Sequence, residues 1–326
     1  MATTLTAEVS AQPIILDNPP PAPPPHLRTN PKLFLIALDA SLVGLSYGVD
    51  IGSIGPITEM PQFRDSVGNF SDLIQGLYVS SFLLFAALSS FGNGYLADRF
   101  GRKYTLLIGA VLAAVGAIMS ASISNLPALF VARAVYAIGI GVGFSTTIVY
   151  LVEIAPAHQR GLLGCVSQLL ITIGIAAAYF ISYGSVTLSG SMAWRTPFIV
   201  QAVIGIAMAV GILFVPFSPR WLMSKGREAE ALETLRKLRN VELDDTLAMN
   251  HVNMELAEIR ADIQFDERVR QGTSYLEIFR GVFPSTSTLL TPANSASDAI
   301  IYLCNGIPTT NWRNTYCPTQ LIVRSM

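Results

Sequence analysis

Charged residues are scarce in this sequence. They make up 13% of its 326 residues, whereas soluble domains carry about 25%. Hydrophobic residues make up 51%, and the mean hydropathy is +0.48. A deficit of this size means that much of the protein surface faces lipid, which excludes an ordinary soluble domain. The net charge is −1, so no excess of basic residues points to a nucleic-acid partner.

Cysteine and histidine are also rare, with three of each. Cys165, Cys304 and Cys317 show no metal-ligand spacing and no disulfide framework. Cys165 falls in an apolar run, so we expect an inert buried thiol there. His158 lies alone in a loop and His251 in a polar segment. Because no cluster of His, Cys, Asp or Glu has catalytic spacing, the sequence predicts neither an enzyme nor a metal or cofactor site.

Six long apolar runs follow one another along the chain. Each has about 20 residues or more, enough for a helix to cross ~30 Å of hydrocarbon. The runs cover residues 33–57, 73–97, 104–124, 127–150, 162–183 and 194–216. The sequence therefore predicts an all-α membrane protein with six transmembrane helices within residues 33–216.

The remaining segments differ in composition. Residues 1–32 include the run NPPPAPPP at positions 18–25, which predicts a disordered Pro-rich tail. Residues 217–283 are polar, with a helical period that predicts a linker of short cytoplasmic helices. Residues 284–326 are rich in Ser, Thr, Pro and Asn and predict an irregular tail.

One helix of the linker has a clear amphipathic pattern. Residues 227–239 place Ala231, Leu235 and Leu238 on one face, and Glu233 lies four residues before Lys237. A further helical pattern runs through residues 250–270. These segments are expected to lie beneath the membrane bundle.

Basic residues in the short loops set the predicted orientation, because they are enriched on the cytoplasmic side. The loops after the second, fourth and sixth runs carry Arg99, Arg102, Lys103, Arg160 and Arg220, whereas loop 58–72 has one base and loop 184–193 has none. We therefore expect a multi-pass protein of the plasma membrane with both termini cytoplasmic.

Two ionisable residues lie inside the predicted membrane region. Asp50 comes late in the first run and Arg133 about two turns into the fourth, which places both in the outer half. Because a lone charge there costs a few kcal/mol, the two are expected to form an ion pair. The pair is either a proton-coupling switch or a static link between two spans. Asp39, nearer the cytoplasmic face, is expected to be interfacial or structural.

Gln168 is an amide deep in the fifth run. An amide offers two donors and an acceptor, which suits a polyhydroxylated ligand, although a hydrogen bond between helices is an equal alternative. Tyr47 and Tyr179 are candidates to line the same cavity, with packing as the alternative role.

Five short segments carry a family resemblance. They are GVDIG at 48–52, GYLADRFGRK at 94–103, YLVEIAPAHQRG at 150–161, WRTPF at 194–198 and PFSPRWL at 216–222. In this order and spacing they resemble the sugar porter family of the major facilitator superfamily, whose members have two six-span halves. The resemblance covers about residues 33–280 and identifies the chain as an N-terminal half.

The resemblance implies proton-coupled transport of a small sugar or polyol across the bilayer. Asp50 would be the proton-responsive acid, with Arg133 as its partner. Gln168 and Gly174, in a Q-x5-G pattern, would contact sugar hydroxyls. The implied cytoplasmic gate network consists of Asp98, Arg99, Arg102, Lys103, Glu153, Arg160 and Arg220.

Several positions depart from the family pattern. Phe217 stands where the family has Glu, which removes one anion from the gate network, and Val149 stands where it has Pro. After about residue 283 the sequence no longer resembles the family. A truncated chain of this kind is expected to be inactive alone. The alternative function is a vestigial or regulatory half-transporter that only packs in the membrane.

We expect the purified chain to self-associate or to lose its fold readily in detergent. Polar groups on the face that a second bundle would cover are costly against lipid. Light scattering coupled to size-exclusion chromatography should give masses above the 35.1 kDa of one chain. A stable, monodisperse monomer would contradict this expectation.

Overall fold

The computed structural model describes residues 31–68, 71–156, 159–241 and 245–272. The predicted tails lie outside these ranges, except for the last two residues of the first tail, and so do His158, Cys304 and Cys317. The chain divides into two compact units, residues 1–263 and 264–326. Of the second unit the structure describes only residues 264–272, which are helical, and the following paragraphs concern the first unit.

The described residues form helices and no strands, and six helical segments among them are long and apolar enough to cross a membrane. The segments are α1–α2 (Pro31–Ala40 and Leu42–Glu59), α4 (Asp72–Phe100), α5 (Arg102–Ser122), α6 (Leu126–Ile154), α7 (Arg160–Ser185) and α8 (Met192–Phe214). Their bounds agree with the six predicted spans to within a few residues. The prediction of an all-α membrane protein with six spans is confirmed.

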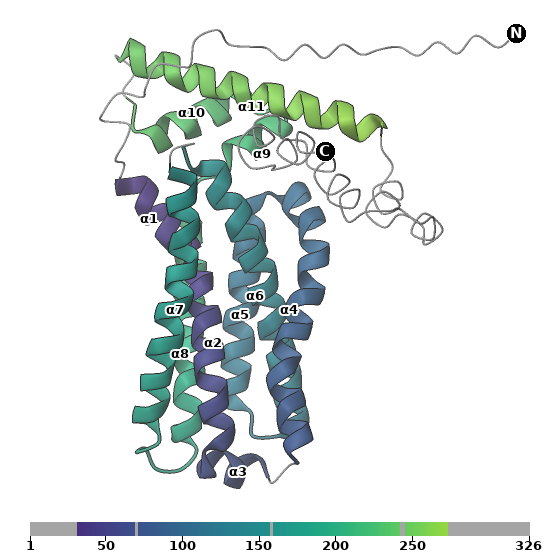
Figure 1. The fold of residues 1–326 in the computed structure, drawn as a ribbon, viewed down its shortest axis with the longest axis vertical. Helices are drawn as coiled ribbons and strands as arrows, with labels where there is room; N and C mark the ends of the chain where they lie inside the picture. The colour runs from purple at the N-terminus through teal and green to yellow at the C-terminus, as the bar shows by residue number, and fades with distance from the viewer. Residues whose placement is uncertain (1–30, 69–70, 157–158, 242–244, 273–326) are drawn as a thin grey trace, which may run out of the picture. The chain divides into compact units, whose positions relative to one another are not determined.

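The spanning helices run side by side, and the other helices lie at the two ends of the bundle (Figure 1). At one end, here called the linker end, lie α9 (Pro219–Ser224), α10 (Glu228–Arg239) and α11 (Thr246–Gly272). At the other, here called the far end, α3 (Pro61–Val67) follows α2. In the predicted orientation the linker end faces the cytoplasm.

The linker helices pack as their sequence pattern predicts. Ala231, Leu235 and Leu238 are buried along one face of α10. On the opposite, exposed face, Glu233 and Lys237 form an ion pair of 2.8 Å. The amphipathic helix is therefore confirmed.

The first span is broken, which the sequence did not predict. Helix α1 ends at Ala40 and α2 begins at Leu42. The hydroxyl of Thr147 donates to the Ala40 carbonyl at 3.0 Å, and Ser167 donates to the Ser41 hydroxyl at 2.9 Å. Polar backbone groups at membrane depth need partners within the protein; Thr147 of α6 provides one for the Ala40 carbonyl, and Ser167 of α7 bonds the Ser41 side chain.

Glycines set a close contact between α2 and α7. A Cβ atom at Gly48 would lie 2.2 Å from the Ile171 carbonyl oxygen, and one at Gly174 would lie 2.5 Å from that of Leu45. Gly44 and Gly52 make similar approaches on the same face of α2. Small residues allow such contacts where lipid supplies no hydrophobic drive for helices to associate. This α2–α7 seam fixes which face of α2 looks into the bundle.

Gly48→Ala should destabilise the bundle by about 1–3 kcal/mol, because the added methyl group meets backbone rather than a side chain that moves aside. Gly55→Ala on the same helix is the matched control, since nothing lies within 4 Å of its Cβ position. Thermal unfolding of both variants in one detergent compares them. Equal midpoints for the two variants would contradict the seam.

Candidate functional site

Asp50 on α2 and Arg133 on α6 form a buried ion pair near the far end of the bundle. Arg133 donates from Nη1 to Oδ1 and from Nη2 to Oδ2, both at 3.2 Å. The side chains are 2% and 3% exposed, respectively. The two residues were predicted to pair because they lie at a similar depth, and the structure places them in contact. This two-pronged geometry suits guanidinium and carboxylate, and each charge compensates the other in the apolar interior.

Aromatic rings of α4 hold the arginine on its other side. The guanidinium carbon lies 5.0 Å from the ring centre of Tyr78 and 5.4 Å from that of Phe82. The Val79 carbonyl accepts a long hydrogen bond of 3.5 Å from Nη2. Arg133 therefore keeps favourable contacts with α4 that do not depend on Asp50.

Gln201 on α8 is a third member of the site that the sequence analysis missed. Its amide nitrogen lies 3.4 Å from Asp50 Oδ1 and 3.4 Å from the Ser53 hydroxyl, and the residue is 1% exposed. The sequence did contain a signal for Gln201, because it is an amide inside an apolar run. The same observation made Gln168 a candidate.

Two buried polar atoms beside the pair have no hydrogen-bond partner among the described residues. They are Nε of Arg133 and the hydroxyl of Tyr78. Buried polar atoms usually have partners. Tyr78 lies against the Arg133 guanidinium, so the site has unused hydrogen-bonding capacity available to a rearranged pair.

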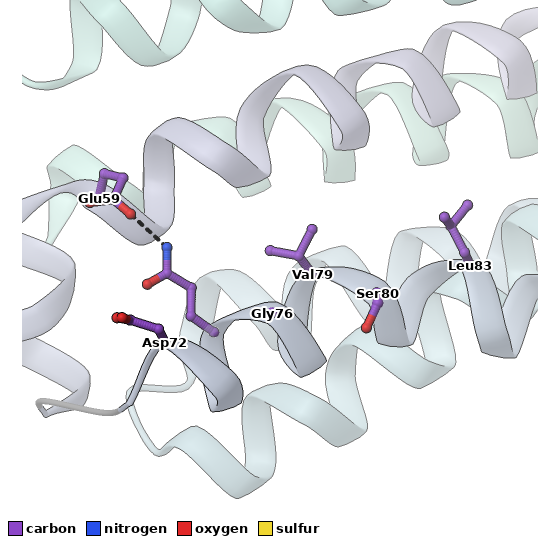
Figure 2. A pocket seen from close by; sticks show the side chains of 7 residues that line it. Glu59, Asp72, Gly76, Val79, Ser80 and Leu83 are labelled. Carbon is purple, nitrogen blue, oxygen red and sulfur yellow. Dashed lines mark hydrogen bonds between the residues drawn. The ribbon is translucent and has the colours of Figure 1, made fainter.

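A cavity of about 510 Å³ opens between the ends of α2 and α4, close to this site (Figure 2). Its lining comprises Glu59, Asp72, Gln75, Gly76, Val79, Ser80 and Leu83. Gln75 donates to Glu59 at 2.6 Å and to the Thr58 hydroxyl at 3.2 Å. Val79 lines the cavity and also accepts from Arg133, so one residue separates the cavity from the ion pair.

The four residues predicted to contact sugar do not share one environment. Gln168 and Tyr179 are exposed on α7. Tyr47 is half-buried against the rings of Phe144 and Phe82. Gly174 is buried in the α2–α7 seam, where its lack of a side chain allows the two helices to pack closely.

Cys165 is exposed on α7, so the prediction of a buried thiol was wrong. An apolar run does not show which of its residues face other helices. Cys165 and Gln168 lie one turn apart on a face of α7 that no described helix covers.

At the linker end, Arg102 on α5 joins two of the predicted gate acids. It pairs with Asp98 at 3.0 Å and with Glu153 at 3.0 Å. Glu153 also accepts from the Ser218 hydroxyl at 2.5 Å, and the Trp221 indole donates to the Asp98 carbonyl at 3.1 Å. The loops after the second and sixth spans are therefore held to each other and to α6.

Phe217, which replaces the expected glutamate, finds other partners. Its ring stacks on Trp221 with ring centres 5.7 Å apart, and the Lys103 ammonium lies 5.4 Å from its centre. Lys103 also donates to the Leu213 carbonyl at 2.8 Å. A cation–π contact thus keeps Lys103 near the position that an anion would have occupied.

Two of the three remaining predicted gate residues make contacts of their own. Arg99 donates to the Tyr95 hydroxyl at 2.8 Å. Arg160 is exposed at the start of α7 and forms no ion pair with the described residues. Arg220 pairs with Asp262 of α11 at 3.7 Å. The predicted network is thus only partly assembled in this conformation.

Arg239 is a linker-end residue to which the sequence gave no role. Only 6% of it is exposed, and it donates to the Ile154 carbonyl at 3.0 Å and to both oxygens of Glu255. It satisfies a carbonyl at the end of α6, where a helix has no partners of its own. Arg239 therefore ties α10 and α11 to the spanning bundle.

Comparison with known proteins places these features in a family. A family model described as "Sugar (and other) transporter" matches residues 36–303, which extends past residue 283. The arabinose-proton symporter of Escherichia coli is 36% identical over 245 residues, covering 75% of this chain and 49% of that protein. The rice sugar transport protein MST8 is also 36% identical over 245 residues, covering 68% of this chain and 47% of that protein.

A solved structure gives the same result. The partially occluded, inward-open xylose transporter XylE from E. coli aligns with a TM-score of 0.64 and 26% identity, over 73% of this chain and 60% of that one. The chain spans about half the length of the curated relatives it matches.

The Asp50–Arg133 pair should show strong energetic coupling. Arg133→Gln leaves a buried carboxylate without its partner and should cost about 3–5 kcal/mol of unfolding free energy. The double variant with Asp50→Asn removes both charges and should cost less than the sum of the single changes. Unfolding in detergent of the four proteins measures the coupling.

The exposed pair Glu59–Arg64, at 2.9 Å, is the matched control. Neutralising it residue by residue should give changes below about 1 kcal/mol that add. Additive costs at Asp50 and Arg133 would contradict a buried, mutually compensated pair.

Proposed function

Because the chain belongs to the sugar (and other) transporter family, we propose that its six-helix bundle takes part in the proton-coupled transport of a sugar or polyol across a membrane. The observation that carries this proposal is the buried ion pair of Asp50 and Arg133. Among the described residues, these two are the only buried charged residues of the spanning helices. Proton symporters for arabinose and galactose are among the relatives.

Protonation of Asp50 is the proposed switch. A proton on Asp50 neutralises the carboxylate, so it removes the ionic attraction without removing the arginine. The contacts of Arg133 with Tyr78, Phe82 and Val79 remain. Two arrangements of the pair then differ little in energy, which a switch between two conformations requires.

Gln201 has a positioning role in this mechanism. Its amide donates to the carboxylate of Asp50 in the ionised state, and an amide oxygen accepts from a protonated acid equally well. Gln201 therefore keeps Asp50 in place in either protonation state.

On the sugar side, Gln168 and Tyr179 remain the proposed contacts, because their exposed face on α7 offers polar groups to a ligand. Tyr47 contributes an aromatic wall on α2. Gly174 acts indirectly, since it allows α7 to lie close to α2.

At the linker end, the cluster around Arg102 and Glu153 is the proposed gate. Its ion pairs join the ends of α4, α5 and α6, and a hydrogen bond from Ser218 to Glu153 adds the segment after α8. Such a set of contacts is broken and remade when helical bundles rock between inward- and outward-open states. Arg99, Arg160 and Arg220 belong to the proposed gate in another state of the cycle.

The proposed organisation follows the sequence analysis. Residues 33–216 form the membrane bundle and 217–283 a cytoplasmic linker, flanked by tails at 1–32 and 284–326. The protein is proposed to lie in the plasma membrane with both termini cytoplasmic and to associate with itself through the uncovered face. The basic loops and the exposed polar side chains of α7 support these points.

The second candidate is a half-transporter that packs in the membrane without transporting. The observation that favours it is that the four predicted sugar contacts do not share one environment: Gln168 and Tyr179 are exposed on α7, whereas Gly174 is buried. In this function the buried ion pair joins α2 and α6 permanently.

Uptake of labelled monosaccharides by cells expressing the chain separates the two functions. If the chain transports, acid outside should drive accumulation above the external concentration, a protonophore should abolish it, and the expectation that the chain is inactive alone would be wrong. Asp50→Asn should abolish accumulation but retain exchange of sugar down its gradient, because coupling is lost and the pathway is kept. Asp65→Asn, an exposed acid on α3, is the control and should accumulate sugar normally.

Proton-driven accumulation that survives in Asp50→Asn would refute the role given to this carboxyl. No uptake of any sugar by a chain that is folded and inserted would favour the half-transporter.

A further inference from the structure

Asp39 is a carboxylate inside the first span that the proposed function does not use. It lies on α1 and is only partly accessible. Its Oδ2 atom is enclosed and has no hydrogen-bond partner among the described residues. Its carboxylate presses on Gly211 of α8, where a Cβ atom would lie 1.7 Å from Oδ1.

The cations on neighbouring helices are engaged elsewhere. Lys32 lies about two turns before Asp39 on α1 and donates to Asn240. Lys103 on α5 donates to the Leu213 carbonyl. On α10, Lys237 pairs with Glu233.

The other titratable groups on these helices also offer Asp39 no proton donor. Arg239 donates to Ile154 and Glu255. On α6, the Tyr150 hydroxyl donates to the Pro216 carbonyl at 3.0 Å, and Glu153 is held by Arg102. On α7, Arg160 is exposed at the helix start.

An ionised Asp39 is therefore unfavourable in this conformation. A charge without a partner is costly inside a span. A neutral carboxyl costs less, because it carries no charge and its hydroxyl can donate to a backbone carbonyl of its own helix.

The position of Asp39 links its environment to helix movement. It lies two residues before Ser41, where the first span breaks. Rotation of α1 about this break would separate the carboxyl from Gly211 and admit water from the linker end. The same span then holds Asp39 and Asp50 about 16 Å apart along the helix axis, one toward each end of the bundle.

We propose that Asp39 is a second proton-binding carboxyl of the bundle, protonated while it lies against Gly211 and ionised when α1 moves away from α8. The O–H bond forms with a proton taken from water at the linker end and breaks by returning that proton to water. The proton is the only ligand of this site.

Infrared spectroscopy of the purified full chain in lipid tests the proposal, with no need for transport activity. At neutral pH the wild-type protein should show the carbonyl-stretch band of a protonated carboxylic acid. Asp39→Asn, neutral and of equal size, should lose this component, whereas Asp72→Asn and Asp50→Asn should retain it. An Asp39→Asn spectrum that keeps the whole band would overturn the proposal.

Gly211→Ala provides a second readout. Its methyl group displaces the end of a side chain, not backbone, so the fold should persist while the band shifts or disappears. An unshifted band would place the protonated group elsewhere and contradict the assignment. Because neither spectrum depends on sugar uptake, loss of the proposed transport function and loss of this site are separate results.

Discussion

The ion pair between Asp50 and Arg133 depends on the way α2 is held. Gly48 and Gly52 lie two residues before and after Asp50, which is about 200° around a helix. The glycine face of α2 is pressed against α7, so Asp50 is directed to the other side, toward α6 and α8. Close packing on one face of a single helix thereby places a charge on the opposite face. The aromatic contacts of Arg133 and the amide of Gln201 complete the site from α4 and α8.

The spans and the ion pair were predictable because both follow from position along the chain. Run length gives the number of spans, and distance from the end of a run gives depth. Rotation about the helix axis is a different quantity, which apolar runs do not encode when a helix is hydrophobic on every side. That is why Gln168 was selected and Gln201 was not, although each is an amide within an apolar run.

The glycines contain part of the missing information. Gly174 faces α2, and Ser167, seven residues earlier, lies on nearly the same side of α7 because seven residues make about two turns. Ser167 is indeed buried, with its hydroxyl on Ser41. Gln168 lies about 240° from Gly174 by the same arithmetic and is exposed. Gly174 marks the side of α7 that packs against α2, and so indicates the rotation of the whole helix about its axis.

The two clusters of charge differ in what surrounds them, and this determines how each responds to a proton. Asp50 and Arg133 are almost fully buried, where a neutralised carboxyl changes the local energy strongly because little water screens it. Around Arg102, Asp98 is largely exposed while Glu153 is enclosed, so salt and water moderate part of that network. Phe217, in place of the expected glutamate, makes this network less ionic, because Lys103 contacts an aromatic ring and a backbone carbonyl. In the proposed mechanism a proton therefore has its largest effect at the buried pair, and the linker-end ion pairs respond through the helices that join the two ends.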